Sequence, residues 1–124
     1  MTRETLLFII DIKQAIEDIE SFTNGVDKNS FLNNKEKQYA VIRSLEIIGE
    51  AVKNVPDSVR KKYPAVEWKK IAGLRDVLIH SYFGADIERV WEVTVKDLPK
   101  LKQDIENIIK DEEKKRNGKE KKKV

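Results

Sequence analysis

Apolar residues recur with helical periodicity along almost the whole chain, whereas the alternating pattern of a half-buried strand is rare. The periodicity predicts a first helix over residues 2–21, ended by the Thr23-Asn24-Gly25 turn, and a second over 35–54, stopped by Pro56. Between them, residues 26–34 are polar apart from Phe31, and this composition predicts a loop.

The second half of the chain continues the helical pattern. We predict a short helix over 57–63 that is capped by Asp57, a long helix over 68–83, and a helix capped by Asp86. A last helix is expected with Asp97 as its N-cap and Pro99 in its first turn. This order of elements predicts an all-α, up-and-down bundle of four to five helices. Its expected core includes Ile10 on the first helix and Tyr39 on the second.

Composition excludes several kinds of site. The 124 residues suffice for one domain with its own core, and they include no cysteine and one histidine. A disulfide framework, a cysteine nucleophile, a cysteine zinc site and a multi-histidine metal cluster within one protomer are therefore excluded. We expect no metal and no cofactor.

The positive net charge belongs to the C-terminus. Residues 114–124 hold seven basic residues and one acidic residue, and the remainder of the chain has a net charge of −3. We predict a helical domain over 1–112 and a Lys-rich disordered tail over 113–124. Such a run of basic residues is more often a solvated chain end than a nucleic-acid-binding arm. No apolar run approaches a membrane span, and no signal-peptide pattern is present, so we expect a cytoplasmic protein.

The histidine lies in a helical segment with other polar residues. Asp76 and His80 are four residues apart and should be neighbours on the helix surface, and Arg75 and Tyr82 share a second face. Arg75 and His80 diverge by about 140° on a straight helix. They act on one substrate only through the reach of the arginine, a loosened helix end near Gly84, or a partner chain that completes the site.

These residue types suit phosphodiester cleavage in RNA. A histidine in a last helical turn beside a carboxylate has its protonated form favoured, and it can serve as acid or base near neutral pH. Arg75 offers donors for a phosphate. On spacing alone, however, an ordinary surface pair between Asp76 and His80 is the commoner arrangement.

A second polar set lies on the helix over 35–54. Arg43, Glu46 and Glu50 fall at helical spacing, followed by Lys53. Such a set usually forms a self-compensating ladder of surface ion pairs. The alternative is that Arg43 or Glu50 faces the groove of Arg75 and His80 and orients them.

The sequence around these residues resembles the HepT-type ribonuclease toxins of the HEPN superfamily. Arg75, His80 and Tyr82 reproduce the Arg-x4-His-x-Tyr signature of that family. The likeness extends over roughly residues 3–110, through the segments at 40–51, 63–64, 68–75, 82–84, 90–91 and 97–101. The Lys-rich tail lies outside it.

The resemblance implies a dimeric helical bundle with two Arg/His sets across a shared cleft. It implies metal-independent endoribonuclease activity, with Arg75 and His80 as the essential pair. It also implies a cognate antitoxin, a minimal nucleotidyltransferase that transfers AMP to the motif tyrosine, here Tyr82. The residue after the motif arginine is frequently Asn in this family, and Asp76 stands there in this chain.

Asp76 keeps a second function open. Its carboxylate would orient His80 but also repel RNA phosphate. The alternative is a non-catalytic helical partner of a nucleotidyltransferase, with a nucleotide-binding role in the same cleft.

Overall fold

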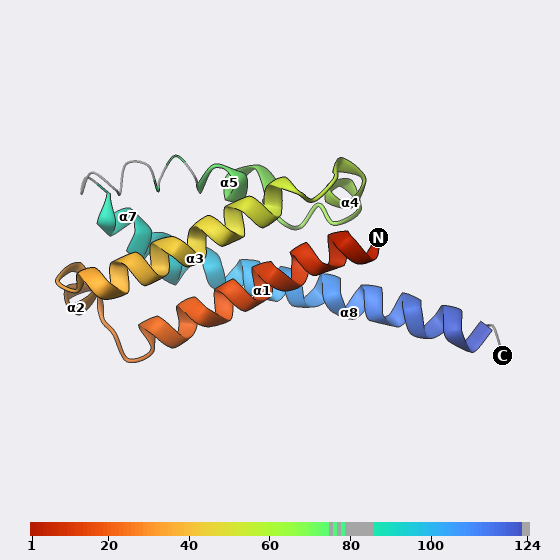
Figure 1. Ribbon diagram of the computed structural model, residues 1–124, viewed down its shortest axis with the longest axis horizontal. Helices are drawn as coiled ribbons and strands as arrows, with labels where there is room; N and C mark the ends of the chain where they lie inside the picture. The colour runs from red at the N-terminus through yellow and green to blue at the C-terminus, as the bar shows by residue number, and fades with distance from the viewer. Residues whose placement is uncertain (75, 77, 79–85, 123–124) are drawn as a thin grey trace.

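The computed structural model describes residues 1–74, 76, 78 and 86–122, and its secondary structure there is helical. Three long helices form the bundle: α1 (Arg3–Thr23), α3 (Lys35–Lys53) and α8 (Leu98–Lys122). Figure 1 shows α1 lying beside α3 on one side and α8 on the other, with the C-terminal end of α8 extending beyond the other helices. Short helices complete the fold: α2 (Lys28–Leu32), α4 (Asp57–Lys62), α5 (Trp68–Ala72) and α7 (Ile87–Glu92). The predicted all-α fold is confirmed.

Side-chain caps fix the ends of the N-terminal helices. The Thr2 hydroxyl accepts a hydrogen bond from the Thr5 amide at 3.1 Å, and the Asn34 side chain accepts one from the Lys37 amide at 3.1 Å. Each cap satisfies an amide that has no partner within its own helix. Gly25 adopts φ 73° after α1, a left-handed conformation that glycine takes without strain.

The core lies where the three long helices meet. Ile9, Ile12, Ile16 and Ile19 of α1 are buried against a stripe on α3 and the first half of α8 that comprises Val41, Leu45, Ile48, Val52, Ile105 and Ile108. Two residues expected in this core lie outside it, since Ile10 is 41% exposed and Tyr39 is 61% exposed. Both project beside the stripes that face the bundle axis.

The segment predicted to be a loop contains α2. The Asp27 side chain accepts a hydrogen bond from the Ser30 amide at 2.8 Å and so starts this helix. Phe31 is fully buried, and its ring lies 5.1 Å from that of Trp91 on α7. A single aromatic contact made through tertiary packing therefore orders a segment whose local sequence is polar.

The expected cap at Asp97 is absent, because the helix does not restart there. A π-helical segment, η1 (Val93–Asp97), joins α7 to α8 without a break, and the Leu98 amide donates to the Val93 carbonyl five residues back. Pro99 has no amide hydrogen and its ring would crowd the carbonyl four residues earlier in a regular α-helix. The wider π-turn accommodates Pro99 and leaves the Asp97 carboxylate for another partner.

The backbone of α8 is helical as far as Lys122, through most of the segment predicted to be a disordered tail. Lys and Glu are good helix formers, and an ion pair between Lys115 and Asp111 at 3.2 Å spans one turn. The described helices include none that is long and apolar enough to cross a membrane.

Candidate functional site

The segment that holds the Arg-x4-His-x-Tyr signature follows α5. Arg75, His80 and Tyr82 lie outside the described residues, as does the predicted end of the helix near residue 84. Leu74 and Leu78 are 7% and 4% exposed, so one side of this segment is apolar and buried where it is described. Asp76 is exposed, and its amide donates to the Gly73 carbonyl at 3.1 Å. The Asp76 side chain therefore lies away from the side of this segment that packs against the core.

Gly73 ends α5 at the entry to this segment. Its amide donates to the Lys69 carbonyl at 3.0 Å, and the helical backbone continues at Leu74. A Cβ at this position would lie 3.3 Å from the Lys70 carbonyl oxygen, closer than an ordinary contact. The approach to the signature is thus a tight turn in which the backbone is packed against itself.

The polar set on α3 forms the predicted ladder. Arg43 pairs with Glu46 at 3.2 Å, and Lys53 pairs with Glu50 at 3.5 Å. The side chains of Arg43 and Glu50 are 73% and 70% exposed, and both line a surface depression between α3 and α1. An orienting role for Arg43 or Glu50 toward Arg75 and His80 stays a prediction.

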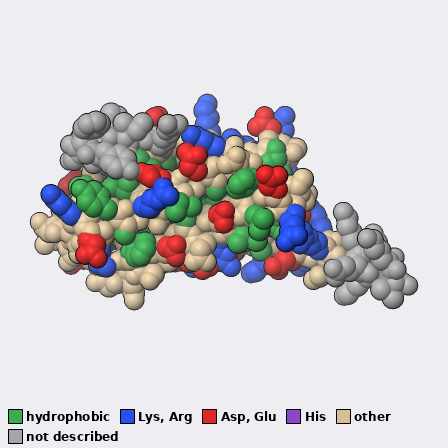
Figure 2. Space-filling model, viewed as in Figure 1, with side chains coloured by type: hydrophobic (Ala, Val, Ile, Leu, Met, Phe, Trp, Pro, Cys, Tyr) green, Lys and Arg blue, Asp and Glu red, His purple; other side chains and the backbone are tan. Residues whose placement is uncertain are grey.

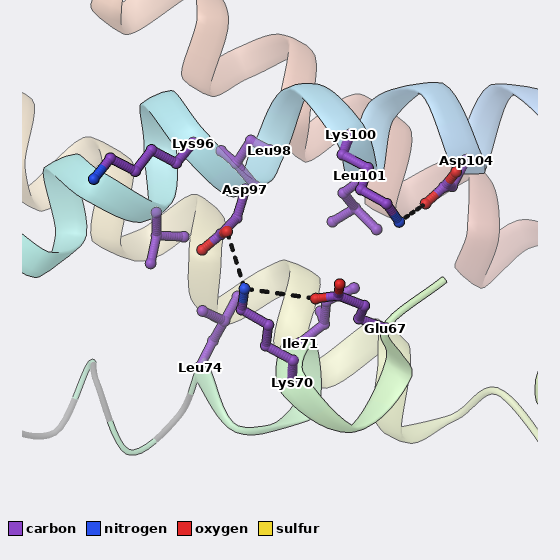
Figure 3. Close-up of a pocket in the computed structure, with 11 residues that line it drawn as sticks. Glu67, Lys70, Ile71, Leu74, Lys96, Asp97, Leu98, Lys100, Leu101 and Asp104 are labelled. Atoms are coloured by element: carbon purple, nitrogen blue, oxygen red, sulfur yellow. Dashed lines mark hydrogen bonds and ion pairs between the residues drawn. The ribbon is translucent and has the colours of Figure 1, made fainter. Parts of the chain in front are cut away.

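A small hollow of about 80 Å³ separates α5 from the η1–α8 junction (Figure 3). Lys70 of α5 reaches across it to Asp97 at 3.1 Å and also pairs with Glu67 at 3.5 Å. Figure 3 shows Lys96 pointing away from this pair. The bridge ties α5, and with it the start of the signature segment, to the π-helical turn.

Two lysines at this hollow are held in the charged form. The hydrogen bond to Asp97, with the nearby negative charges, raises the pKa of Lys70 above its ordinary value. The hydrogen bond to Asp104, at 2.8 Å, likewise raises the pKa of Lys100, whose ammonium group also donates to the Ala65 carbonyl. The hollow thus has fixed charges of both signs, and most of its cations are already matched by carboxylates.

A second cluster anchors the approach to α5. The Tyr63 hydroxyl lies 2.5 Å from Asp111 Oδ2 and 2.8 Å from Glu112 Oε1, both on α8. Lys62 pairs with Glu112 at 3.2 Å. The Tyr63 carbonyl accepts a hydrogen bond from the Trp68 indole at 3.0 Å, so this cluster also fixes the first residue of α5.

Partial burial and the two carboxylates strongly raise the pKa of Tyr63 above its usual value. The Tyr63 and Lys115 hydrogen bonds lower the pKa of Asp111. For Glu112, burial acts to raise the pKa, but the hydrogen bonds from Tyr63 and Lys62 together outweigh it, and the pKa is lowered. The arrangement therefore favours a neutral phenol between two ionised carboxylates.

Sequence spacing identifies the ladder on α3 but misses these two clusters. Lys70 and Asp97 are 27 residues apart, and Tyr63 is 48 residues from Asp111. No periodicity links residues so far apart, because one cluster joins α5 to η1 and the other joins the end of α4 to α8. Within the described part of the chain, no three His, Cys, Asp or Glu side chains are grouped as metal ligands.

Comparison with known proteins gives a family for the chain. Residues 12–108 match the HepT-like family, described as ribonuclease HepT-like. A protein of Methanocaldococcus jannaschii assigned as an RNase is 49% identical over 113 residues, which cover 91% of this chain and 97% of that protein. A second such protein of the same organism is 47% identical over 109 residues, or 88% and 90% of the two chains.

A protein of Thermococcus cleftensis assigned as ribonuclease HepT is 44% identical over 110 residues, which cover 89% of this chain and 100% of that protein. No solved structure matches the chain. The family match spans all three signature positions, the whole of α3, and parts of α1 and α8. The chain belongs to the HepT-like ribonuclease family.

Proposed function

We propose that this protein is a metal-independent endoribonuclease that cleaves RNA with Arg75 and His80. The observation that carries the proposal is membership of a ribonuclease family over residues 12–108, together with the Arg-x4-His-x-Tyr spacing inside that range. RNA supplies its own nucleophile, the 2′-hydroxyl, so the reaction needs neither a metal-bound water nor a protein nucleophile.

The chemistry divides between two side chains. The 2′-oxygen attacks the adjacent phosphorus and loses its proton to a base, while the bond to the 5′-oxygen breaks and that oxygen takes up a proton. His80 is the proposed proton-transfer group, as the one histidine of the chain. Arg75 is proposed to bind the phosphate and the charge that develops on its non-bridging oxygens. The products are a 2′,3′-cyclic phosphate and a free 5′-hydroxyl.

Asp76 is proposed to support His80. The two residues are one helical turn apart in sequence, and Asp76 is exposed in the structure. Arg43 and Glu50 are proposed as further supports, since both lie on an exposed edge of α3 with their own partners. A carboxylate at residue 76 also opposes an approaching phosphate, so it tunes the affinity for RNA as well as the orientation of His80.

The biological setting proposed is a type VII toxin–antitoxin pair in the cytoplasm. The toxin would be a homodimer, because Arg75 and His80 point in different directions on one straight helix and two copies supply both groups to one cleft. The antitoxin would be a cognate nucleotidyltransferase that silences the toxin by transferring AMP to Tyr82.

The test is an RNase assay in the presence of EDTA. The wild-type protein should cut RNA and leave 2′,3′-cyclic phosphate ends. Replacement of His80 or Arg75 by Ala should lower the rate by at least about 100-fold, the lower end for loss of a positioned acid–base group. The matched control is Arg89→Ala, which removes a cation from the exposed side of α7 and should retain activity.

Equal cleavage by the wild-type protein and the His80→Ala variant would identify a contaminating nuclease and contradict the proposal. An absence of cleavage in all preparations, with binding to the nucleotidyltransferase retained, would instead establish the alternative of a non-catalytic partner module.

A further inference from the structure

The basic residues of the helical domain are concentrated in α4 and α5. Residues 57–72 hold five basic and two acidic residues, a net charge of +3, although residues 1–113 together have a net charge of −3. In three dimensions both helices lie along one edge of the bundle, on the chain segment that leads into the signature (Figure 1). The domain therefore presents a positive region on the chain segment that precedes the proposed catalytic residues in sequence.

Two lysines in this region are not neutralised. Lys61 and Lys69 are exposed and make no hydrogen bond or ion pair with the described residues. Their sequence neighbours behave differently, since Lys62 pairs with Glu112 and Lys70 pairs with Asp97. The unpaired ammonium groups are free to contact an anion from solvent.

Arg60 adds a cation that is held in position. Its Nε donates to the Val55 carbonyl at 3.0 Å and its Nη2 donates to the Val52 carbonyl at 2.8 Å, at the C-terminal end of α3. A guanidinium group has five N–H donors in a fixed plane. Two of these N–H groups hold the guanidinium in place, and three remain to donate to a further acceptor. Because the side chain is already fixed, binding an anion costs it little further conformational entropy.

Arg60 and Lys69 lie at a wide surface depression, and Lys61 follows Arg60 on α4. Arg60, Lys69 and Lys70 line it together with Val66, Glu67 and Trp68, and it encloses about 710 Å³. Lys70 and Glu67 already pair with each other at 3.5 Å, which leaves Arg60 and Lys69 as the uncompensated charges. An open, positively charged depression suits an extended polyanion better than a small buried ligand.

We propose that the α4–α5 surface binds the phosphate backbone of the RNA strand next to the cleaved bond, through Arg60, Lys61 and Lys69. This inference rests on the proposed ribonuclease function. Lys69 precedes Arg75 by six residues, so at most about 22 Å of extended chain separates the two positions. The contacts are to phosphates and therefore carry no base preference.

The experiment measures binding of single-stranded 2′-O-methyl RNA, which has no free 2′-hydroxyl and is not cleaved. The variant is Lys61→Gln/Lys69→Gln, and the control is Lys28→Gln/Lys110→Gln, which removes two exposed lysines from α2 and the middle of α8. Gln and Lys have similar helix propensities, so both variants should fold. Arg60 is left in place because it also caps α3.

For the wild-type protein the logarithm of the affinity should fall linearly with the logarithm of salt concentration. Loss of two phosphate contacts should make this slope shallower by about 1.4 and weaken binding about tenfold at low salt. In cleavage assays of ordinary RNA the same variant should raise KM and leave kcat nearly unchanged, because the contacts are equal in the ground and transition states. The control should match the wild type.

The two proposals fail separately. Ordinary RNA cleaved equally well by both double variants, with the same salt slope, would overturn the α4–α5 surface and leave the ribonuclease function intact. Binding that depends on Lys61 and Lys69 without any cleavage would overturn the ribonuclease function and leave the surface intact. No binding of 2′-O-methyl RNA by the wild-type protein would overturn the α4–α5 surface, and the cleavage assay alone would then decide the ribonuclease function.

Discussion

At the scale of single residues, the division between buried and exposed positions organises the signature segment. Leu74 and Leu78 fix one side of it to the core, and Asp76 lies on the opposite, exposed side. A change at Asp76 should therefore alter the surface charge without opening a cavity, whereas a change at Leu74 or Leu78 would disturb the segment itself. Within the described part of this segment, packing is therefore carried by Leu74 and Leu78 and not by Asp76.

Tyr82 is the residue at which we expect regulation. Co-expression with the cognate nucleotidyltransferase should increase the intact mass of the wild-type protein by one or more adenylyl groups. The added phosphate has at least one negative charge, which would repel the RNA backbone and occupy Arg75, so RNase activity should fall with the extent of modification.

The matched variant is Tyr82→Phe, which lacks the acceptor hydroxyl and should keep both its mass and its activity after co-expression. Full inhibition of wild-type protein whose mass is unchanged would show that the antitoxin acts by covering the site. In that case Tyr82 would not be the regulatory residue.

Short-range pairs of residues could be predicted from the sequence, whereas long-range pairs could not. The Arg43–Glu46 and Lys53–Glu50 pairs follow from helical spacing, because residues three apart are neighbours on any helix. The Lys70–Asp97 bridge depends instead on how α5 meets the η1–α8 junction. The position of Arg60 could not be predicted either, because its hydrogen-bond acceptors are backbone carbonyl groups that no sequence pattern marks.

At the scale of helices and their ends, the sequence predicted only part of what local chemistry decides. The cap expected at Asp57 was wrong, because α4 begins at Asp57 itself, with Pro56 at the N-cap position and no side-chain capping hydrogen bond. The ends of α1 and α3 follow from Thr2, Asn34 and the turn at Gly25. The short helix α2 was missed because its stability comes from the burial of Phe31 against α7 rather than from its own five residues. The cap expected at Asp97 was wrong because a π-turn, rather than a break, accommodates Pro99.

The Tyr63 cluster is one of the contacts that join the α4–α5 connection to α8. Replacement of Tyr63 by Phe removes the hydroxyl that lies between Asp111 and Glu112 and leaves the ring in place. The free energy of unfolding should fall by about 1–2 kcal/mol, between the usual net contribution of a neutral hydrogen bond and that of one to a charged group, because the Asp111 carboxylate is partly exposed. Urea denaturation followed by circular dichroism measures this change.

Tyr39→Phe is the control, because Tyr39 is 61% exposed and its hydroxyl makes no hydrogen bond with the described residues. Its effect should stay within about 0.5 kcal/mol. Equal stabilities of the Tyr63→Phe and Tyr39→Phe variants would show that the cluster does not stabilise the fold.

The stability difference between wild type and Tyr63→Phe should also depend on pH. The pKa values of Asp111 and Glu112 are lowered in the folded protein, so their contribution is present above the unfolded pKa values near 4 and is lost as the pH falls. The pKa of Tyr63 is raised, so its contribution is present at neutral pH and is lost above about 10, where the unfolded phenol ionises. Denaturation at pH 3, 7 and 10.5 should show the largest difference at pH 7, and a constant difference would contradict the assignment.

At the scale of the whole molecule, α1 and α3 form an outer face that is neither fully polar nor fully apolar. Figure 2 shows apolar, acidic and basic side chains interspersed on this face. Leu7, Ile10 and Ile47 are 51%, 41% and 37% exposed there. The general bundle architecture followed from the periodicity of apolar residues. Which apolar residues stay outside the core depends on the rotation of each helix about its own axis, and periodicity leaves that rotation undetermined by tens of degrees.

The last prediction concerns assembly. A chain that ends after Arg116 should remain a dimer at micromolar concentration in multi-angle light scattering, as the full-length protein is expected to be. The truncation keeps the α1–α3 face, the core part of α8 and the Lys115–Asp111 pair, and it removes only the basic end of α8. If the tail bridged two protomers instead, the truncated chain would be monomeric. A monomer that still cleaves RNA at the full-length rate would contradict the shared cleft itself, because one protomer would then bring Arg75 and His80 together without a partner.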